Sequence, residues 1–415
     1  MTPNKLSEYI DVDRMQRRLD ELSEIAKTSD GGVTRLAYTE AETEAYEYIL
    51  TELSNEYDIT EDTVGNVFAT QQSDAAKSVL TGSHLDSVFN GGPLDGALGV
   101  VVSLEAVNAV YRADVDCAFP PTLAIFRGEE SARFGHHTIG SRAALGMLDI
   151  QTLAATDQNG VPLWKAMQDI GFQPDNLSEP SIDFDSVAAF LETHIEQGRV
   201  LEEHGDDLGI VSSIRAPVRY RVTVGGNYDH SGATPMGLRQ DALTAASEMV
   251  VAIEEIAEEA AADGDIVGTV GTITAVDGSI NQVCGRVEFS LDLRSNDIDY
   301  RDDVESRLLE TIDAIAASRG VTLETEGIAR SDPVSLDDGI VAQLQSAAES
   351  IGAKHRVLPS GGGHDAMNFE LNGIPTGMVF VPSIDGVSHN PDEETTPEAI
   401  EGAAAGLAHS IVALE

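Results

Sequence analysis

The stretch TGSHLDSVFNGGPLDGALGV, residues 81–100, sets a histidine and two aspartates among glycines. The apolar run that leads into it, KSVLTGSH, predicts a buried strand, and GALGVVVSLEAVNAVYRA, residues 96–113, predicts a buried helix. In sheets whose strands alternate with helices, ligands bind at the carboxyl ends of the strands. His84, Asp86 and Asp95 therefore stand where an α/β protein is expected to keep its site.

The rest of the chain predicts an α/β domain with a second domain inserted into it. PPTLAIFRGEES (120–131) and DSVAAFLETHIEQG (185–198) are further predicted strands that end in polar residues. After residue 213 the order becomes strand, helix, strand, strand, helix, strand, which predicts a ferredoxin-like α+β sandwich. Near residue 330 the chain returns to the pattern of apolar strands and helices seen in its first part. We expect an α/β domain of residues 1–212 and 330–415, interrupted by an inserted domain of residues 213–329.

The charge balance is extreme, with 71 acidic residues against 25 basic ones and a formal net charge of −46. Self-repulsion of this size destabilises a compact state in dilute buffer, whereas at molar salt the Debye length falls to about 3 Å. We therefore expect the salt-loaded cytoplasm of a halophile, and neither nucleic acid nor an anionic membrane as a partner.

The N-terminus lacks the apolar core of a signal peptide. Cys117 and Cys284 fit no disulfide framework and are expected to be ordinary thiols.

Potential metal ligands follow the predicted strands at four places, which are His84 with Asp86 and Asp95, the pair Glu129 and Glu130, His194 with Glu196, and His389. Imidazole and carboxylate together suit Zn, Mn, Co or Ni. Such a set holds two ions if one carboxylate bridges them, and two ions about 3.5–4 Å apart polarise a substrate oxygen and activate water. Alternation along HLD lets Asp86 accept the second ring N–H of His84. Taken singly, a histidine is more often a hydrogen-bonded or exposed residue than a metal ligand, and paired acids in so acidic a chain are usually solvated; their position after predicted strands is what favours a metal site.

At this point the chain resembles a known family. GSHLDSVFNGGPLDGALGV, FRGEESARFG, LETHIEQGRVLE, HSGATPMGLRQDA, SGGGHDAM and FVPSIDGVSHNPDE look like the successive signatures of the hydantoinase/carbamoylase amidases. These are a subgroup of the dinuclear M20-type metallohydrolases that includes N-carbamoyl-L-amino acid hydrolases, allantoate amidohydrolases and β-ureidopropionases. The resemblance runs from about GGVTRLAYTEAE at residue 31 to the C-terminus. It implies a metal-binding catalytic α/β domain interrupted by a lid and dimerisation domain.

The resemblance also implies the metal centre. The ligands of two divalent ions (Zn²⁺ or Mn²⁺, with Co²⁺ or Ni²⁺ as alternatives) would be His84, Asp95, Glu130, His194 and His389, with Asp95 bridging. Glu129 would be the general base that takes a proton from the attacking water and delivers it to the leaving nitrogen. Ordinary M20 peptidases tend to carry an acidic ligand where His194 stands, which favours an amidase acting on a ureido group.

The inserted domain would supply further residues. By the resemblance, His230 reaches the active site of the partner subunit in a homodimer and stabilises the oxyanion, while Asn281 and Arg294 hold the substrate carboxylate. Without the family match, His230 would be interpreted as a turn histidine. Three more residues are candidates for the substrate pocket, of which the last is equally well interpreted as orienting a metal ligand, and they are Gln197, Gly362 and His364.

The function implied is hydrolysis of an N-carbamoyl-L-amino acid to the amino acid, CO2 and ammonia. Allantoate or β-ureidopropionate hydrolysis is the alternative, followed by a dipeptidase or aminoacylase, and by a non-catalytic binding protein on the same fold. The chain departs from the family pattern in having Ser131 and Ala132 after GEE, Ala233 in HSGATPM, and Cys284 where proline is usual. None of these departures removes a metal ligand.

Overall fold

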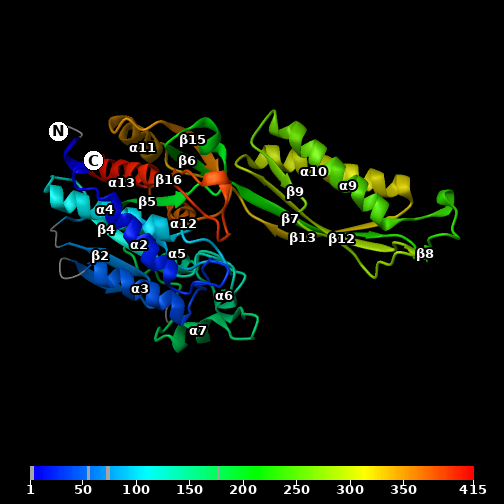
Figure 1. The fold of residues 1–415 in the computed structure, drawn as a ribbon, viewed down its shortest axis with the longest axis horizontal. Coiled ribbons are helices and arrows are strands. Elements are labelled where there is room, and N and C mark those ends of the chain that lie inside the picture. The colour runs from blue at the N-terminus through cyan, green and yellow to red at the C-terminus, as the bar shows by residue number, and fades with distance from the viewer. Residues whose placement is uncertain (1–3, 54–56, 72–74, 175–176) are drawn as a thin grey trace. The chain divides into compact units, whose positions relative to one another are not determined.

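The computed structural model describes residues 4–53, 57–71, 75–174 and 177–415, which form two compact units (Figure 1). The main unit contains the chain up to Ser212 together with Leu336–Ser360 and His364–Glu415. The inserted unit contains Ser213–Ser335 together with Gly361–Gly363. The return to the main unit falls later than the boundary at 329–330 that the sequence predicts, because strand β13 continues to Arg330, which still pairs with Val218 of β7.

A mixed sheet runs through the main unit in the order β1-β2-β4-β3-β5-β16-β6-β14, with β15 paired to β6. Its strands are β1 (Asp58–Glu61), β2 (Val67–Thr70), β3 (Ser78–His84), β4 (Pro121–Phe126), β5 (Val187–Ile195), β6 (Leu208–Ile214), β14 (Val334–Ser335), β15 (His355–Ser360) and β16 (Thr376–Val381). Strands β4, β3, β5 and β16 are parallel neighbours. The carboxyl ends of four strands therefore meet along one edge of the sheet.

The central strands and the helix that follows β3 are buried on nearly every side, as the sequence predicts. All residues of β4 and β16 are buried, which is typical of parallel strands covered on both faces. Helix α4 (Ala97–Ala113) buries nearly its whole length against β3, β4 and β5 and against α13 (Pro397–Ala413). Because α4 begins at Ala97, two residues after Asp95, this packing fixes where the polar loop between β3 and α4 ends.

The remaining helices surround this sheet. They are α1 (Asn4–Ser7), α2 (Val12–Glu24), α3 (Glu40–Leu53), α5 (Ile139–Ala144), α6 (Ile150–Ala154), α7 (Leu163–Asp169), α8 (Val200–His204), α11 (Asp338–Ser350) and α12 (Asp365–Leu371), with short 3-10 turns at Phe184–Ser186 and Ile384–Gly386. Helices α2 and α11 pack on α13, and α12 packs on β5 and β16. Among the described residues no helix is both long and apolar enough to cross a membrane.

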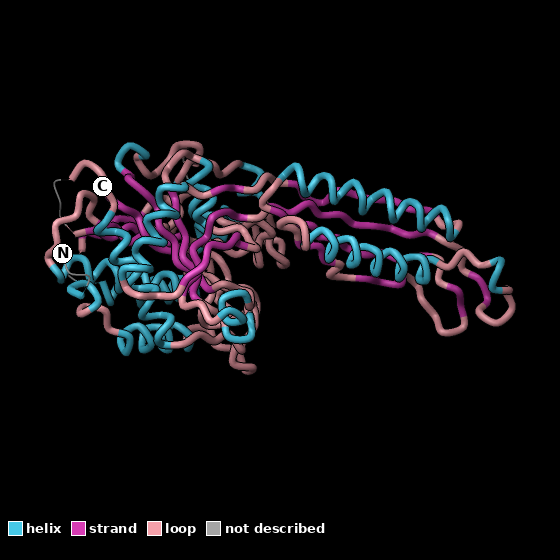
Figure 2. The backbone as a smooth tube through the Cα atoms, turned by 90° about the horizontal axis from the view of Figure 1, so that it is seen from above, coloured by secondary structure: helices cyan, strands magenta, loops and turns pink. Residues whose placement is uncertain are grey.

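The inserted unit is an antiparallel sheet with two long helices packed on one face (Figure 2). Its strands are β7 (Ala216–Gly225), β8 (Asp229–His230), β9 (Val267–Thr269), β10 (Ile273–Ala275), β11 (Gln282–Val283), β12 (Arg286–Ser295) and β13 (Thr322–Arg330), and its helices are α9 (Ala242–Ala261) and α10 (Ile298–Arg319), with a 3-10 turn at Met236–Leu238. The sheet order is β10-β12-β7-β13, with β9 also paired to β12, and β8 pairs with β11.

This unit differs from the predicted order in one place. The second strand of that order is split into β9 and β10, and between them the amide and the hydroxyl of Thr272 both bond to Ser290 Oγ on β12. Strand β12 alternates between buried and more exposed residues, and Val287, Phe289, Leu291 and Leu293 are all buried against the helices. The α/β class of the fold is confirmed.

Candidate active site

The candidate ligands come together from five separate places in the main unit. His84 is the last residue of β3, His194 lies near the end of β5, and Glu129 and Glu130 follow β4. Asp95 precedes α4, and His389 lies in the loop after β16. Each side chain thus stands at the carboxyl edge of the parallel strands, where the sequence placed it.

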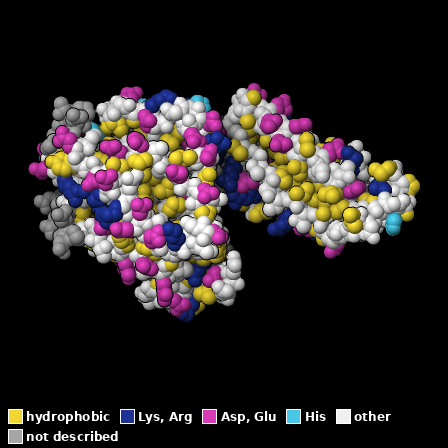
Figure 3. Space-filling view, viewed as in Figure 1, with side chains coloured by type: hydrophobic (Ala, Val, Ile, Leu, Met, Phe, Trp, Pro, Cys, Tyr) yellow, Lys and Arg dark blue, Asp and Glu magenta, His cyan; other side chains and the backbone are white. Residues whose placement is uncertain are grey.

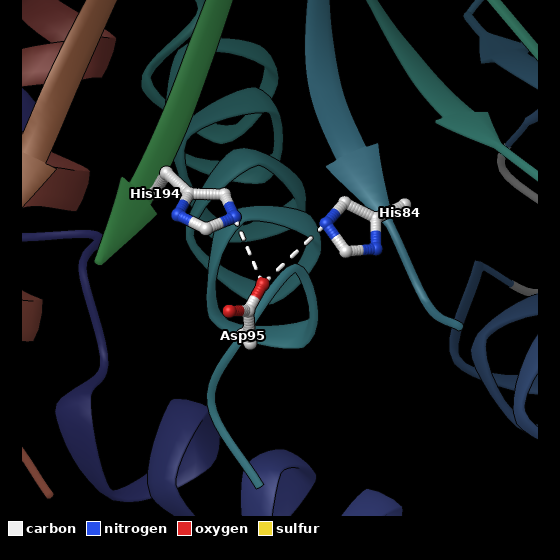
Figure 4. A group of neighbouring side chains, drawn as sticks. All are labelled: His84, Asp95 and His194. Carbon is white, nitrogen blue, oxygen red and sulfur yellow. Dashed lines mark ion pairs between the residues drawn. The ribbon is translucent and has the colours of Figure 1, made fainter. Parts of the chain in front are cut away.

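His84, Asp95 and His194 form one group of potential ligands, and all three are buried (Figure 4). Asp95 Oδ1 lies 3.1 Å from His194 Nε2 and 3.6 Å from His84 Nε2. The two imidazole rings are stacked, with centroids 5.8 Å apart and planes inclined by 27°. Both histidines therefore direct Nε2 toward the same carboxylate oxygen.

Asp95, Glu130 and His389 form a second group. His389 Nε2 lies 3.4 Å from Asp95 Oδ2 and 3.4 Å from Glu130 Oε1. His389 is half exposed, whereas the two carboxylates are buried. Asp95 thus offers one oxygen to each group, which is the arrangement that a carboxylate bridging two ions requires.

The donor set fits divalent cations. Within the described part of the chain, His84 Nε2 is a buried atom without a hydrogen-bond partner, which is costly unless another group satisfies it. Burial opposes a charge on His84, yet its hydrogen bond to Asp86 and the charge of Glu129 outweigh burial and raise its pKa well above the ordinary value. Hydrogen bonds that His389 donates to the carboxylates of Asp95 and Glu130 raise the pKa of His389 to about 11. The acids thus stabilise positive charge at this place, which divalent ions supply when bound.

Asp86 anchors three of these residues at once. Its Oδ1 accepts the backbone N–H of Glu129 and its Oδ2 accepts that of Glu130, both at 3.0 Å. His84 Nδ1 lies 3.2 Å from the backbone oxygen of Asp86 and 3.3 Å from its Oδ1. Asp86 therefore fixes both the GEE turn and the ring of His84. Only its contact with His84 was expected from the sequence.

Glu393 is a residue that the sequence analysis did not single out. It is 6% exposed, and its carboxylate accepts the backbone N–H groups of Leu94, Asp95 and His389. Burial, followed by the charge of Asp95, raises its pKa to about 7. Its place in SHNPDE, four residues after a candidate ligand, was the only available signal, because paired acids are common throughout this chain.

Glu129 is buried beside both groups, with Oε2 at 3.9 Å from His84 Nε2. Burial is the main reason that its pKa lies well above the ordinary glutamate value, and the nearby carboxylates of Glu130 and Asp365 raise it further. A carboxylate that can take and hold a proton at this position has the property that a general base needs.

The other candidates of the main unit lie close by. Gln197 Nε2 donates to Asp95 Oδ2 at 2.7 Å, so its amide steadies the shared carboxylate. The His364 ring packs on that of His194, with centroids 4.6 Å apart, and His364 Nε2 lies 2.9 Å from Ser360 Oγ. Burial and the neighbouring His194 lower the pKa of His364 well below the ordinary value. Glu196 instead caps α8 through the backbone N–H groups of Val200 and Leu201.

The sequence matches the model of the M20/M25/M40 peptidase family over residues 80–413. The chain belongs to peptidase family M20. It is 39% identical to an N-carbamoyl-L-amino acid amidohydrolase of Geobacillus stearothermophilus, with 97% of this chain and 98% of that protein aligned. An allantoate amidohydrolase of Bacillus subtilis is 34% identical, with 96% and 94% aligned. A hydantoinase/carbamoylase family amidase of Burkholderia multivorans has a similar structure, with a TM-score of 0.91 at 33% identity over 97% and 98% of the two chains. The family resemblance drawn from the motifs is confirmed.

In this M20 protein His230 and Asn281 lie at the same end of the inserted unit. His230 in β8 pairs with Gln282 in β11, and Ser231 N donates to the backbone oxygen of Asn281. His230 is exposed, and its Nδ1 accepts the backbone N–H groups of Gly232 and Ala233, each at 3.1 Å. Because Nδ1 accepts, the proton of a neutral ring lies on Nε2, which can donate to another molecule.

Arg294 lies near the carboxyl end of β12, and hydrogen bonds hold its guanidinium in one orientation. Its Nε and Nη2 donate to the two oxygens of Asp292 at 3.0 and 2.9 Å, and its Nη1 donates to Gly361 O at 2.6 Å. Asp292 also accepts Nε of Arg219 at 2.9 Å. Although burial opposes the shift, the hydrogen bonds and charges of Arg294 and Arg219 lower the pKa of Asp292.

The structure separates two residues that the resemblance assigns to one carboxylate. Arg294 pairs with Pro217 and Arg286 with Gly225, so both β12 and β7 run between Arg294 and the turn that holds Asn281. At about 3.3 Å per residue, the eight steps from Arg286 to Arg294 alone span roughly 26 Å. Asn281 and Arg294 of the same chain therefore cannot hold the same carboxylate.

Gly96 should be indispensable to the site. Its φ is +66°, and an added Cβ would lie 2.4 Å from Cε1 of His84. We expect Gly96→Ala to lower the free energy of unfolding by at least about 1–2 kcal/mol through the backbone alone and to weaken metal binding by displacing His84. Denaturant unfolding in molar KCl and metal titration would measure both effects.

Gly402 provides the control. It lies in α13 with nothing within 4 Å of an added Cβ, so Gly402→Ala should be neutral or stabilising by about 0.5–1 kcal/mol. A Gly96→Ala variant with wild-type stability and metal affinity would contradict the role given to Gly96.

Proposed function

We propose that this protein is a metal-dependent amidohydrolase that cleaves the ureido C–N bond of an N-carbamoyl-L-amino acid. The observation that carries the proposal is the buried Glu129 beside two imidazole–carboxylate groups that share Asp95. The similarity to the Geobacillus stearothermophilus enzyme extends over nearly the whole of both chains and supports the same reaction class.

The main unit would carry out the chemistry. His84, Asp95, Glu130, His194 and His389 would hold two divalent ions, which when bound polarise the ureido oxygen and lower the pKa of water. Glu129 would take the proton of the water that adds to the ureido carbon. The bond from that carbon to the amino-acid nitrogen then breaks, and Glu129 returns the proton to the nitrogen. The released carbamate breaks down to CO2 and ammonia, so atoms and charges balance. Zn²⁺ and Mn²⁺ are the preferred ions, with Co²⁺ and Ni²⁺ as alternatives.

The inserted unit would supply substrate recognition. Arg294 would hold the substrate carboxylate, because Asp292 occupies one side of its guanidinium and leaves N–H groups on Nη1 and Nη2 to bind a second acid. His230 would stabilise the oxyanion through Nε2, and Asn281 would act beside it. Gln197, Gly362 and His364 would line the substrate pocket. Since Asn281 and His230 lie one strand length away from Arg294, we propose that they act in the site of a partner subunit, within a homodimer.

Allantoate and β-ureidopropionate hydrolysis are the alternatives, since both use the same centre, and the Bacillus subtilis relative is named an allantoate amidohydrolase. A dipeptidase or aminoacylase activity is a weaker alternative. A non-catalytic binding protein would have no need for Glu129 beside a complete set of ligands.

The first experiment is ammonia release at molar KCl with added Mn²⁺. N-carbamoyl-L- and D-amino acids, β-ureidopropionate, allantoate and dipeptides, the last followed by amino-acid release, form the panel. We expect turnover of the L-carbamoyl compounds and none of their D-enantiomers. Preference for allantoate would keep the mechanism but change the substrate. Cleavage of peptides alone would overturn the assignment.

A pair of inactive variants tests both the base and the dimer. Glu129→Gln removes the proton carrier and His230→Ala the oxyanion donor, so each homodimer should lose at least about 10²-fold in kcat. In a mixed dimer one of the two sites has both residues intact, and random mixing of a symmetric dimer should restore about a quarter of the wild-type activity. Co-expression of the two chains measures this. If mixing restored no activity although mixed dimers form, His230 would not act across the subunits.

We further propose that the protein works in the salt-loaded cytoplasm of a halophile. Acidic side chains are spread over the face seen in Figure 3 and do not gather in one patch. The formal charge of −46 then acts as general self-repulsion that salt must screen. No partner of high negative charge is expected.

Salt should stabilise the fold through this screening. We expect the melting temperature followed by circular dichroism to rise steeply from 0.1 M to about 1 M KCl and to flatten above it, because the Debye length falls from about 10 Å to about 3 Å. Sucrose at matched osmolality is the control, since it does not screen charge. Equal melting temperatures in 0.1 M and 2 M KCl would contradict the halophilic assignment.

A further inference from the structure

The carboxylate of Glu393 connects two segments that carry candidate ligands and lie almost 300 residues apart in the sequence. Its Oε2 accepts the backbone N–H groups of Leu94 and Asp95, each at 3.1 Å. Its Oε1 accepts the backbone N–H of His389 at 2.8 Å. A charged acceptor for three backbone donors in a buried place is a strong local restraint. Glu393 thus fixes the main chain of Asp95 relative to that of His389.

The surroundings of Glu393 leave its carboxylate little room to move. A Cβ added to Gly92 would lie 2.0 Å from both Cδ and Oε2 of Glu393, so the GGP turn packs directly on the carboxylate. His389 has a φ of +55°, which is uncommon for a residue other than glycine and needs outside support. The bond from His389 N to Glu393 supplies such support.

The two groups of ligands depend on Glu393 to different degrees. His84 and His194 are fully buried, and each ring is oriented by a backbone oxygen at Nδ1, that of Asp86 for His84 and that of Ile195 for His194. Asp95 and His389 are the two residues whose main chain Glu393 holds. The first group, His84, Asp95 and His194, keeps two independently placed ligands without Glu393, whereas the second group, Asp95, Glu130 and His389, keeps only Glu130.

We propose that Glu393 is a positioning residue that makes the second metal position, at Asp95, Glu130 and His389, bind its ion. The inference rests on the proposed two-ion centre and adds to it a residue that contacts no ion. Residues that orient metal ligands typically change metal affinity by about 10–100-fold when they are replaced. Replacing Glu393 should therefore weaken mainly the binding of one of the two ions, the one at the second position.

Glu393→Gln tests this with little change in shape. Any orientation of the new amide directs its N–H groups at one or more of the backbone donors that the carboxylate now accepts. The adjacent Glu394 is exposed, so Glu394→Gln removes the same charge one residue away without touching these bonds. The apo forms of both variants and of the wild type would be titrated with Mn²⁺ alone in molar KCl, by equilibrium dialysis and calorimetry.

We expect two Mn²⁺ ions in the wild type and in Glu394→Gln. In Glu393→Gln the second ion should bind about 10–100-fold more weakly, while the first keeps its affinity within about threefold. Two ions of wild-type affinity in Glu393→Gln would overturn the proposal, and so would an equal loss at both positions, which indicates a general structural defect.

Gly92→Ala is a second probe, and it decides the question if Glu393→Gln does not fold as judged by circular dichroism. It keeps the carboxylate but displaces it, and we expect the same selective loss of one ion. Unchanged binding of two ions in Gly92→Ala would then overturn the inference. A wild-type protein that binds fewer than two ions would overturn the proposed metal centre itself, so the two failures remain distinguishable.

Discussion

The sharing of Asp95 between two imidazole–carboxylate groups is the constraint on which the rest of the site depends. One oxygen lies toward His84 and His194 and the other toward His389. Three carboxylates, those of Asp95, Glu129 and Glu130, are buried within reach of one another, an arrangement that would be strongly unfavourable without nearby positive charge. The raised pKa values of His84 and His389 are a consequence of this acidic environment, and two divalent ions would compensate the negative charge more completely than protons do.

Meeting this demand requires segments distant in sequence to be held together at their ends. The parallel pairing of β4, β3, β5 and β16 brings the strand ends to one edge, but it does not fix the loops beyond them. Two buried carboxylates do so by accepting backbone N–H groups, with Asp86 holding the GEE turn and Glu393 holding Asp95 and His389. Because an N–H group is present at every residue except proline, such anchors place the ligands without restricting which side chain each ligand position carries.

Much of this site could be predicted from the sequence, because strand runs that end in His, Asp or Glu are local patterns. His84, Asp95, Glu129, Glu130, His194 and His389 could each be named from the residues around them. Glu393 could not, because its partners at 94 and 95 are far away in the sequence and nothing local separates it from the many solvated acids of this chain. The split between β9 and β10 was likewise hidden, since Thr272 between them bonds to Ser290 Oγ of another strand. The distance between Asn281 and Arg294 could be read only from the register of β12 on β7.

That register gives the inserted unit a particular role in the proposed reaction. Strands β7 and β12 pair over ten successive residues, from Arg286 opposite Gly225 to Ser295 opposite Ala216, and α9 and α10 cover one face of this ladder. A paired, covered ladder cannot shorten without breaking its hydrogen bonds, so Arg294 and His230 of one chain remain about a strand length apart in any state of the folded unit. If both contact a substrate, they contact substrates in different sites, and each site then needs two chains. In the proposed reaction, chemistry and recognition would thereby be separated, because the ions and the base would belong to the main unit of one chain, while selectivity for the acid and for the oxyanion would come from inserted units.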